Sequence, residues 1–452
     1  MALTRRGVCE VLIGAGLAGQ ARRLAWAPPA LARQERPNPG GADGSGPANA
    51  PRFGPAVKAR KSAPKYKTVL SLDGGGTRGV ISTKVLERVE EKIKDNIRRN
   101  GLAEGDFEVD LADYFDLVAS YFVTKGGLSQ AWLSSDGEFV EYDRKSGMPP
   151  LRAGSARALE MIFRLKADEI FPASPLGPLA NLSAVLNPKY GLEGLNYVMG
   201  RVLGDLTLGD AQTSVLMPTF ELETSRPVDF WADCSGGEAT KTGYTAIRIR
   251  QLGDKGGEWE PDRLFKSGND FSIKEVAVAS AAFPSLYPAS PIRYPDGTTR
   301  NYSDGGLISS NPTTSALSYM QIQRQVPLSK LAVLSLGCGV VLPNRISVKD
   351  KGILGWLNEG QMIPLFLDQK SEYMQSIVDG LFYKVLNATP GQYTRIQIAV
   401  DQDNKFFDED RMGALSSADD FREMDDLAMI GGELADVSDA AIARFVDDFV
   451  MA

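Results

Sequence analysis

Residues 70–79, LSLDGGGTRG, form the most informative stretch of this 452-residue chain. The run at 66–72 that leads into it is rich in strand-forming residues, and 80–100 carries an apolar stripe at i,i+4 spacing (Ile81, Val85, Val89 and Ile93). Three consecutive glycines allow positive φ angles and close approach to the backbone. A helix that begins directly after such a loop points its free N–H groups into it. The stretch therefore predicts a strand, a glycine loop able to hold an anion, and a helix.

The same glycines fit the dinucleotide-binding pattern Gly74-x-Gly76-x-x-Gly79. That pattern needs an acidic residue at the end of a second strand, about 20 residues past the last glycine. Residues 98–100 are Arg-Arg-Asn and lie inside the predicted helix, so we do not expect a nucleotide site.

The rest of the chain alternates between predicted strands and helices. A second unit has a strand at 114–119, the pair Gly126-Gly127 and a helix-compatible segment at 128–133. Further helices are predicted at 155–170 and 192–203, and further strands at 214–222, 244–250 and 331–336. This alternation predicts an α/β fold with a mainly parallel sheet covered by helices on both faces. In such folds the active site lies where the carboxyl ends of the strands open onto loops.

Charge is distributed unevenly along the chain. Residues 1–67 hold 12 Lys and Arg against 3 acidic residues, whereas 401–452 hold 15 acidic residues against 4 basic ones. Nucleic-acid binding needs a dense basic face, so the acidic folded part argues against a nucleic-acid partner. It also argues against electrostatic docking on anionic lipid.

The basic N-terminus predicts a targeting segment. Residues 1–32 have the twin Arg5-Arg6, an apolar run and a small-residue cleavage candidate, as in a Tat-like export signal, although Glu10 and Arg22-Arg23 interrupt the run. Residues 33–65, rich in Pro, Gly and Ala, predict a flexible linker. We expect a core at 66–320, an acidic continuation of the same domain at 321–452, and export to the periplasm or medium. If 1–32 is not a signal, the protein is cytoplasmic.

The chain contains no histidine. This excludes Ser-His-Asp and Cys-His catalysis and histidine-ligated metal sites. The three cysteines, Cys9, Cys234 and Cys338, are too few for a disulfide framework or a cysteine metal site, and we expect no metal or organic cofactor. The remaining route to acyl transfer is a carboxylate that contacts a hydroxyl directly, with backbone N–H groups stabilising the oxyanion.

Seven segments in order resemble the patatin-like phospholipases, lipid acyl hydrolases with a Ser-Asp dyad. They are LSLDGGGTRG (70–79), YFDLVA (114–119), KYGLEGLNYVMGRVLGDLTLGDA (189–211), VLMPTFELETSRPVDF (215–230), VASAAFPSLYP (278–288), YSDGGLISSNP (302–312) and LAVLSLGCG (331–339). The resemblance covers about residues 65 to 450 and implies a three-layer α/β fold.

By position, the resemblance implies an oxyanion-hole loop of Gly74, Gly75, Gly76 and Gly79, held in place by Arg78. It also implies that Asp304, followed by Gly305 and Gly306, is the base of the dyad. An aspartate before two glycines suits a carboxylate presented on a tight turn. Taken alone, Asp304 would be read as an ordinary Asp-Gly turn.

The chain departs from the family at the nucleophile. Where the family has Gly-x-Ser-x-Gly after its second strand, residues 120–127 read SYFVTKGG, and the motif occurs nowhere else. Thr124 is the first candidate because it precedes the two glycines by the family's interval, although Phe122 occupies the position of the first small residue. Ser129, five residues late, is the second candidate, and Ser120 is the third.

Two hypotheses follow. The favoured one is a lipid acyl hydrolase that acts on phospholipids or other acyl esters and can contact a membrane peripherally. The other is an inactive member of the fold that binds lipid or a protein. A sequence error across 120–125 would leave the same pattern. The sequence fixes neither the lipid class nor the oligomeric state.

Overall fold

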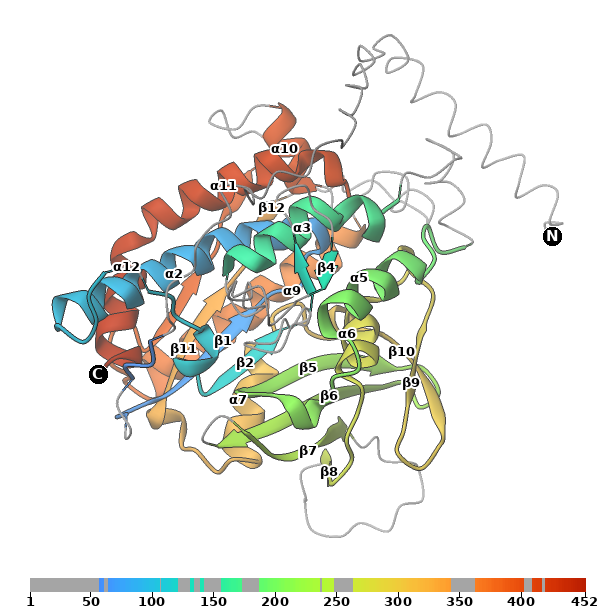
Figure 1. Ribbon diagram of the computed structural model, residues 1–452, viewed down its shortest axis with the longest axis horizontal. Coiled ribbons are helices and arrows are strands. Elements are labelled where there is room, and N and C mark those ends of the chain that lie inside the picture. The colour runs from blue at the N-terminus through green and yellow to red at the C-terminus, as the bar shows by residue number, and fades with distance from the viewer. Residues whose placement is uncertain are drawn as a thin grey trace, which may run out of the picture.

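A mixed β-sheet lies at the centre of the computed structural model (Figure 1). The structure describes residues 57–60, 64–105, 107–120, 131–133, 139–141, 156–172, 187–235, 238–247, 263–342, 362–401, 409–416 and 419–452. The predicted signal at 1–32 lies outside these residues, as does the predicted linker at 33–65 apart from 57–60 and 64–65. None of the helices described is long and apolar enough to cross a membrane.

Eight strands form the main path of the sheet in the described part of the chain. Their spatial order is β13 (Tyr393–Ile396), β11 (Leu331–Leu336), β1 (Lys67–Leu72), β2 (Leu117–Ser120), β5 (Ser214–Glu221), β6 (Arg226–Ser235), β7 (Glu238–Ile247) and β8 (Arg263–Ser267). β10 (Thr299–Asp304) pairs with β5 and with β9 (Ser290–Arg293). Two short pairs stand apart: β3 (Ala131–Leu133) with β4 (Phe139–Glu141), and β12 (Val340–Leu342) with β14 (Ala399–Asp401).

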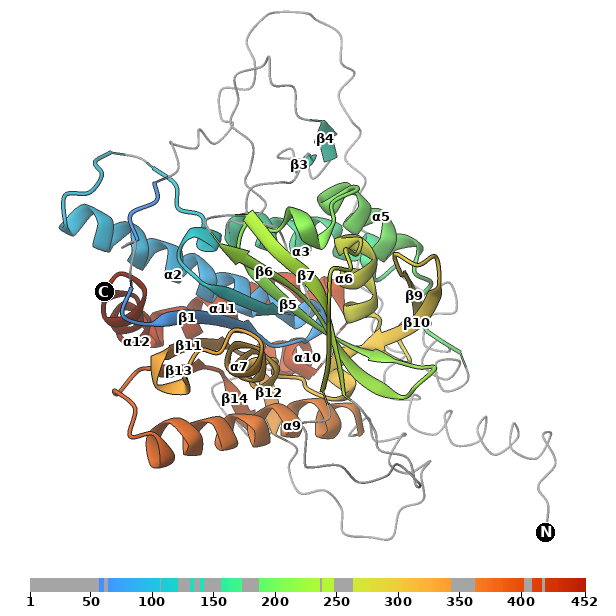
Figure 2. The same cartoon turned by 90° about the horizontal axis from the view of Figure 1, so that it is seen from below.

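Helices cover both faces of the sheet (Figures 1 and 2). One face packs on α2 (Gly79–Arg99), α3 (Ala156–Ile170), α5 (Glu193–Leu203), α6 (Ile273–Ala281), α11 (Met424–Val437) and α12 (Asp439–Phe445). The other packs on α7 (Thr313–Ile322), α9 (Met362–Asp379) and the π-helical turn Gly380–Val385 that follows it. The short α10 (Glu409–Ser416) packs against α11, and the π-helical turn Val446–Val450 follows α12. The predicted α/β, three-layer fold is confirmed.

The two halves of the sheet differ in strand direction. From β13 to β5 neighbouring strands are parallel, and these strands carry the near-continuous apolar sequences of strands buried on both faces, such as LAVLSL in β11. From β5 through β6 and β7 to β8 the pairing is antiparallel, a hairpin-built extension that the predicted alternation of strands and helices did not include. The helix expected over 128–133 is wrong for Ala131–Leu133, which form β3.

The acidic C-terminal segment packs on the first helix. α11 crosses α2 closely at Gly431, where an added Cβ atom would lie 2.9 Å from the Ile81 Cα atom and 3.0 Å from its carbonyl oxygen. At the next residue, Gly432, an added Cβ atom would meet nothing within 4 Å. The contact of α11 with α2 therefore depends on the missing side chain of Gly431.

This crossing predicts opposite effects for two neighbouring substitutions. Gly431→Ala forces two helix backbones apart and should lower the free energy of unfolding by about 1–3 kcal/mol. Gly432→Ala gains helix propensity without a clash and should raise it by up to about 1 kcal/mol. Thermal or urea unfolding of both variants measures the difference, and equal effects would contradict the close crossing.

Candidate active site

The glycine loop connects β1 to α2 through the 3-10 turn Gly76–Arg78. Gly76 has a φ of +58°, in the left-handed region that favours glycine. A Cβ atom at Gly75 would lie 2.3 Å from the Cys338 Sγ atom, and one at Gly79 would lie 2.7 Å from the Phe163 ring of α3. Each of these glycines is therefore required locally, for backbone conformation or for space.

The backbone N–H groups of the glycine loop differ in whether they already have a hydrogen-bond acceptor in the described part of the protein. The Gly74 N–H donates to the Ser310 carbonyl at 3.2 Å, so it already has a protein acceptor. The amides of Gly75 and Gly76 have no acceptor among the described residues. These two N–H groups, at the start of the 3-10 turn that leads into α2, are the ones left to bind an oxyanion.

Arg78 holds the glycine loop in place through its buried side chain. Its side chain is buried, forms an ion pair with Asp368 of α9 at 3.1 Å, and donates to the carbonyl of Gly339 at 3.1 Å. The resemblance implied this holding role for Arg78, and the contacts show its partners. Cys338 lies beside the same loop and donates to the Gly74 carbonyl at 3.4 Å; burial raises the pKa of its thiol to about 11.

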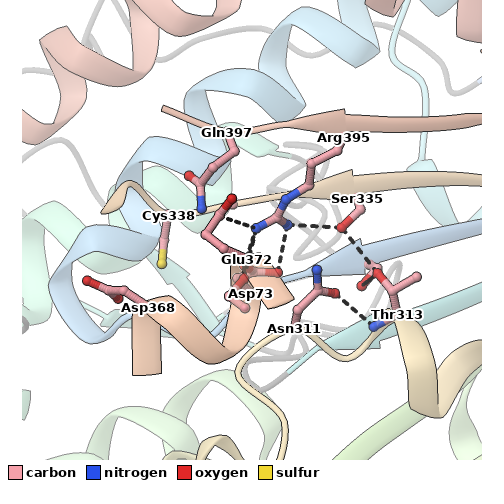
Figure 3. A network of polar contacts seen from close by, with 12 residues as sticks. Asp73, Asn311, Thr313, Ser335, Cys338, Asp368, Glu372, Arg395 and Gln397 are labelled. Carbon is pink, nitrogen blue, oxygen red and sulfur yellow. Dashed lines mark hydrogen bonds and ion pairs between the residues drawn. The ribbon is translucent and has the colours of Figure 1, made fainter. Parts of the chain in front are cut away.

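A second buried ion pair holds the first residue of the loop (Figure 3). The Arg395 guanidinium of β13 donates to both carboxylate oxygens of Asp73, at 2.9 and 2.6 Å, and the two side chains are 4% and 2% exposed. Ser371 of α9 donates to Asp73 at 2.7 Å, and Ser335 of β11 accepts from Arg395 at 3.0 Å. Asp73 is thereby fixed to two other strands and to α9.

Asp304 ends β10 and turns into the 3-10 turn Gly305–Leu307. Its Oδ1 accepts from the Gly306 N–H at 2.6 Å, and its own N–H donates to the Ala282 carbonyl at 3.0 Å. A Cβ atom at Gly305 would lie 2.4 Å from the Pro218 carbonyl oxygen, which explains the glycine after Asp304. The turn is thus closely packed against β5.

Burial raises the pKa of Asp304 to about 7, against the opposing effects of the Gly306 N–H and the Lys370 ammonium. Lys370 extends from α9 and donates to the carbonyls of Leu307 and, at 3.3 Å, Gly306. A carboxyl with a pKa near 7 is ionised in part at neutral pH and accepts a proton readily there.

β2 and β10 pair with consecutive parts of the same edge of β5. β6 covers one edge of β5 over 215–221, while on the other edge β2 pairs with 214–216 and β10 with 219–221. Ala119 is level with Leu216, and Asp304 is level with Thr219, three residues further on. At 3.3 Å per residue the gap is about 10 Å. The end of β2 and Asp304 therefore lie along the same edge of β5.

The turn at Asp304 is also joined to the glycine loop. Besides the bond from Gly74 to Ser310, Thr313 at the start of α7 donates to Ser71 of β1 at 2.9 Å and to Ser335 at 3.1 Å. Segments more than 200 residues apart in the sequence thus meet at the carboxyl ends of β1 and β11. This is where parallel sheets place their sites.

One of the three nucleophile candidates, Ser120, lies at the end of β2. Ser120 is the last residue of β2, is buried, and pairs with Leu72 directly before the glycine loop. Thr124 and Ser129 lie outside the described residues. The choice among the three stays a prediction.

A cavity of about 130 Å³ lies beside Gly305. It opens on the face of the sheet that α7 covers, and its walls include Pro218 of β5, Asp229 of β6, Ile308, and Met374 of α9. Space for a small ligand therefore exists next to the Asp304 turn.

The fold and the site define a class of protein: a three-layer α/β fold with a glycine loop, a buried aspartate turn and no histidine. A family model described as patatin-like phospholipase matches residues 155–317, which include the Asp304 turn. Patatin-like protein 2 of Oryza sativa subsp. indica is 27% identical over 403 residues, 82% of this chain and 84% of the relative. Patatin-like protein 2 of Arabidopsis thaliana is 26% identical over 392 residues, 81% and 82% of the two chains.

A third relative, patatin-like protein 6 of Arabidopsis thaliana, is 30% identical over 284 residues, 60% of this chain and 46% of the relative. The chain is thus similar to patatin-like proteins over about four fifths of its length, and its residues 155–317 match the model of the patatin-like phospholipase family. This similarity supports a function of the lipid acyl hydrolase type at the level of the family.

Sequence reasoning missed the residues that hold the site together. Arg395, Asp368, Lys370 and Ser371 come from segments with no recognisable motif, and 322 positions separate Asp73 from Arg395. One signal was present: YTRIQIAV places Arg395 inside an apolar strand, and a charged side chain buried in a strand needs a buried partner.

The Asp73 pair predicts a large stability loss on truncation. Arg395→Met leaves a buried carboxylate without its cation and should cost about 3–5 kcal/mol of unfolding free energy. The control Arg99→Met removes an exposed pair with Asp447 and should cost less than about 1 kcal/mol. Urea unfolding compares the two, and similar losses would contradict the anchoring role.

The raised pKa of Asp304 predicts that the stability difference between the parent and Asp304→Asn depends on pH. Its folded pKa of about 7 lies above the ordinary value of an aspartate, so ionised Asp304 destabilises the fold as pH rises from about 4 through 7. Asp304→Asn keeps an acceptor for the Gly306 N–H but does not ionise. We expect this variant and the parent to melt at the same temperature at pH 4. At pH 8 the variant should melt at a higher temperature, because its free energy of unfolding should be larger by on the order of 2 kcal/mol. An unchanged difference between the two pH values would show that burial does not raise this pKa.

Proposed function

We propose that the protein hydrolyses carboxylic ester bonds of lipids with a two-residue site. Asp304 is the base, a hydroxyl from 120–129 is the nucleophile, and the Gly75 and Gly76 amides bind the oxyanion. The observation that carries the proposal is the shared edge of β5, where Ala119 near the end of β2 and Asp304 of β10 pair with positions only three residues apart.

The reaction has two acyl-transfer steps. The hydroxyl attacks the ester carbonyl while Asp304 takes its proton, and the oxyanion forms against the two glycine amides. Asp304 then returns the proton to the leaving alcohol oxygen, which leaves an acyl-enzyme. In the second step Asp304 takes a proton from water as the water attacks the acyl group, and the nucleophile recovers its proton as the fatty acid leaves.

The raised pKa of Asp304 suits this role. A carboxylate with an ordinary pKa near 4 is a weak base toward a hydroxyl, whereas one with a pKa of about 7 is stronger and still ionised in part at neutral pH. Hydrolysis should therefore increase with pH through about 7, because protonated Asp304 cannot act as the base. Lys370 favours the ionised form in this site.

The second candidate function is an inactive lipid- or protein-binding module of the same fold. The observation that favours it is the absence of Gly-x-Ser-x-Gly, together with Phe122 where the elbow needs a small residue. In either case, 1–32 would direct export to the periplasm or medium. The two functions differ in whether a hydroxyl at 120–129 reacts.

Fluorophosphonate labelling of the full chain, with mass-spectrometric mapping, tests the proposal. We expect one labelled hydroxyl at 120–129, lost in one of Ser120→Ala, Thr124→Ala or Ser129→Ala and reduced at least 100-fold in rate in Asp304→Asn. Asp296→Asn is the matched control, because Asp296 also precedes a glycine in a turn but is fully exposed. A folded protein that does not label would favour the binding module.

A further inference from the structure

The helix that contacts the site also carries an exposed apolar band. On α9 and the π-helical turn after it, Tyr373 is 64% exposed, Ile377 is 45% exposed and Val385 is 71% exposed. Tyr373 and Ile377 are one helical turn apart and therefore share a face. In Figure 2, α9 lies along the lower edge of the described fold, outside α7 and the sheet.

This outer band is not needed to attach the helix to the sheet. Val378 and Phe382 are fully buried against α7 and the strands beneath it and already provide that attachment. An amphipathic helix on a soluble surface would carry polar side chains on its outer face. The outer face of α9 instead has an aromatic and an aliphatic residue, with Ser376 beside them.

The band is continuous with the candidate active site. Lys370 and Ser371, less than one turn before Tyr373, contact the turn after Asp304 and the Asp73 carboxylate. Met374, the residue after Tyr373, lines the cavity beside Gly305 together with Ile308, which is 40% exposed. Exposed apolar surface thus begins at the rim of that cavity and extends along the helix.

The charge of the band indicates how it would bind. From Lys370 to Val385 the charged residues are Lys370, Glu372, Asp379 and Lys384, two of each sign, so this segment has no net charge within an otherwise acidic fold. A neutral apolar face with a tyrosine inserts at the boundary between lipid headgroups and acyl chains and does not depend on anionic lipid. A zwitterionic phospholipid surface matches this chemistry.

We propose that Tyr373, Ile377 and Ile308 form a docking surface for zwitterionic phospholipid, which places the cavity beside Gly305 at the lipid interface. The choice of a lipid partner rests on the proposed function. The docking itself needs no catalysis, so it can be measured separately from ester hydrolysis.

Co-sedimentation of the full chain with phosphatidylcholine vesicles tests the surface. We expect the parent protein to bind at both low and high salt, and the double variant Tyr373→Asp/Ile377→Asp to lose at least 10-fold in vesicle partitioning. The control Val437→Asp introduces one aspartate on α11 at a residue that is 82% exposed, and should bind as the parent does.

Hydrolysis assays separate this proposal from the proposed function. The double variant should cleave a water-soluble short-chain ester at the parental rate and lose activity only on vesicles. If no variant hydrolyses any ester but vesicle binding is still lost in the double variant, the docking surface stands and the hydrolase falls. A parent protein that does not bind vesicles, a double variant that binds equally well, or a parent dimer that the double variant converts to a monomer without vesicle binding would overturn the proposal.

Discussion

The buried ion pair between Asp73 and Arg395 is the constraint on which the site depends. It fixes the end of β1 to β13 and, through Ser371, to α9. A carboxylate this deeply buried is tolerated only with its cation and hydrogen bonds in place. The glycine loop follows Asp73 directly, so the positions of the Gly75 and Gly76 amides depend on this pair. The second pair, Arg78 with Asp368, fixes the far side of the same loop to the same helix.

The other half of the site depends on strand pairing. β5 offers one edge to both β2 and β10, and the antiparallel half of the sheet brings β10 to that edge. The position of Asp304 relative to the end of β2 is therefore set by the pairing of both strands with β5. The hydrogen bond from Gly74 to Ser310 then joins the two halves. Asp304 and the Gly75 and Gly76 amides, which we propose as base and oxyanion donors, are held by one sheet, as a preorganised site requires.

Local features of the site could be predicted from the sequence, because their causes are local. The glycine loop follows from three glycines between a strand and a helix, and α2 follows from its apolar stripe, observed at Gly79–Arg99. The turn at Asp304 follows from the two glycines after it, whereas the role of Asp304 as a base was implied only by the family resemblance. The partners of Asp73 and Arg78 could not be predicted, because they come from distant segments and depend on which strands become neighbours. The occupied amide of Gly74 was missed for the same reason, since its acceptor is Ser310.

The most direct test of the account is a crystal structure of the protein after reaction with a fluorophosphonate. We expect a phosphonyl group on a hydroxyl at 120–129, with its oxygen accepting from the Gly75 and Gly76 amides and Asp304 within hydrogen-bond reach of the attached oxygen. An adduct elsewhere on the chain, or one whose phosphonyl oxygen points away from these two glycines, would contradict it.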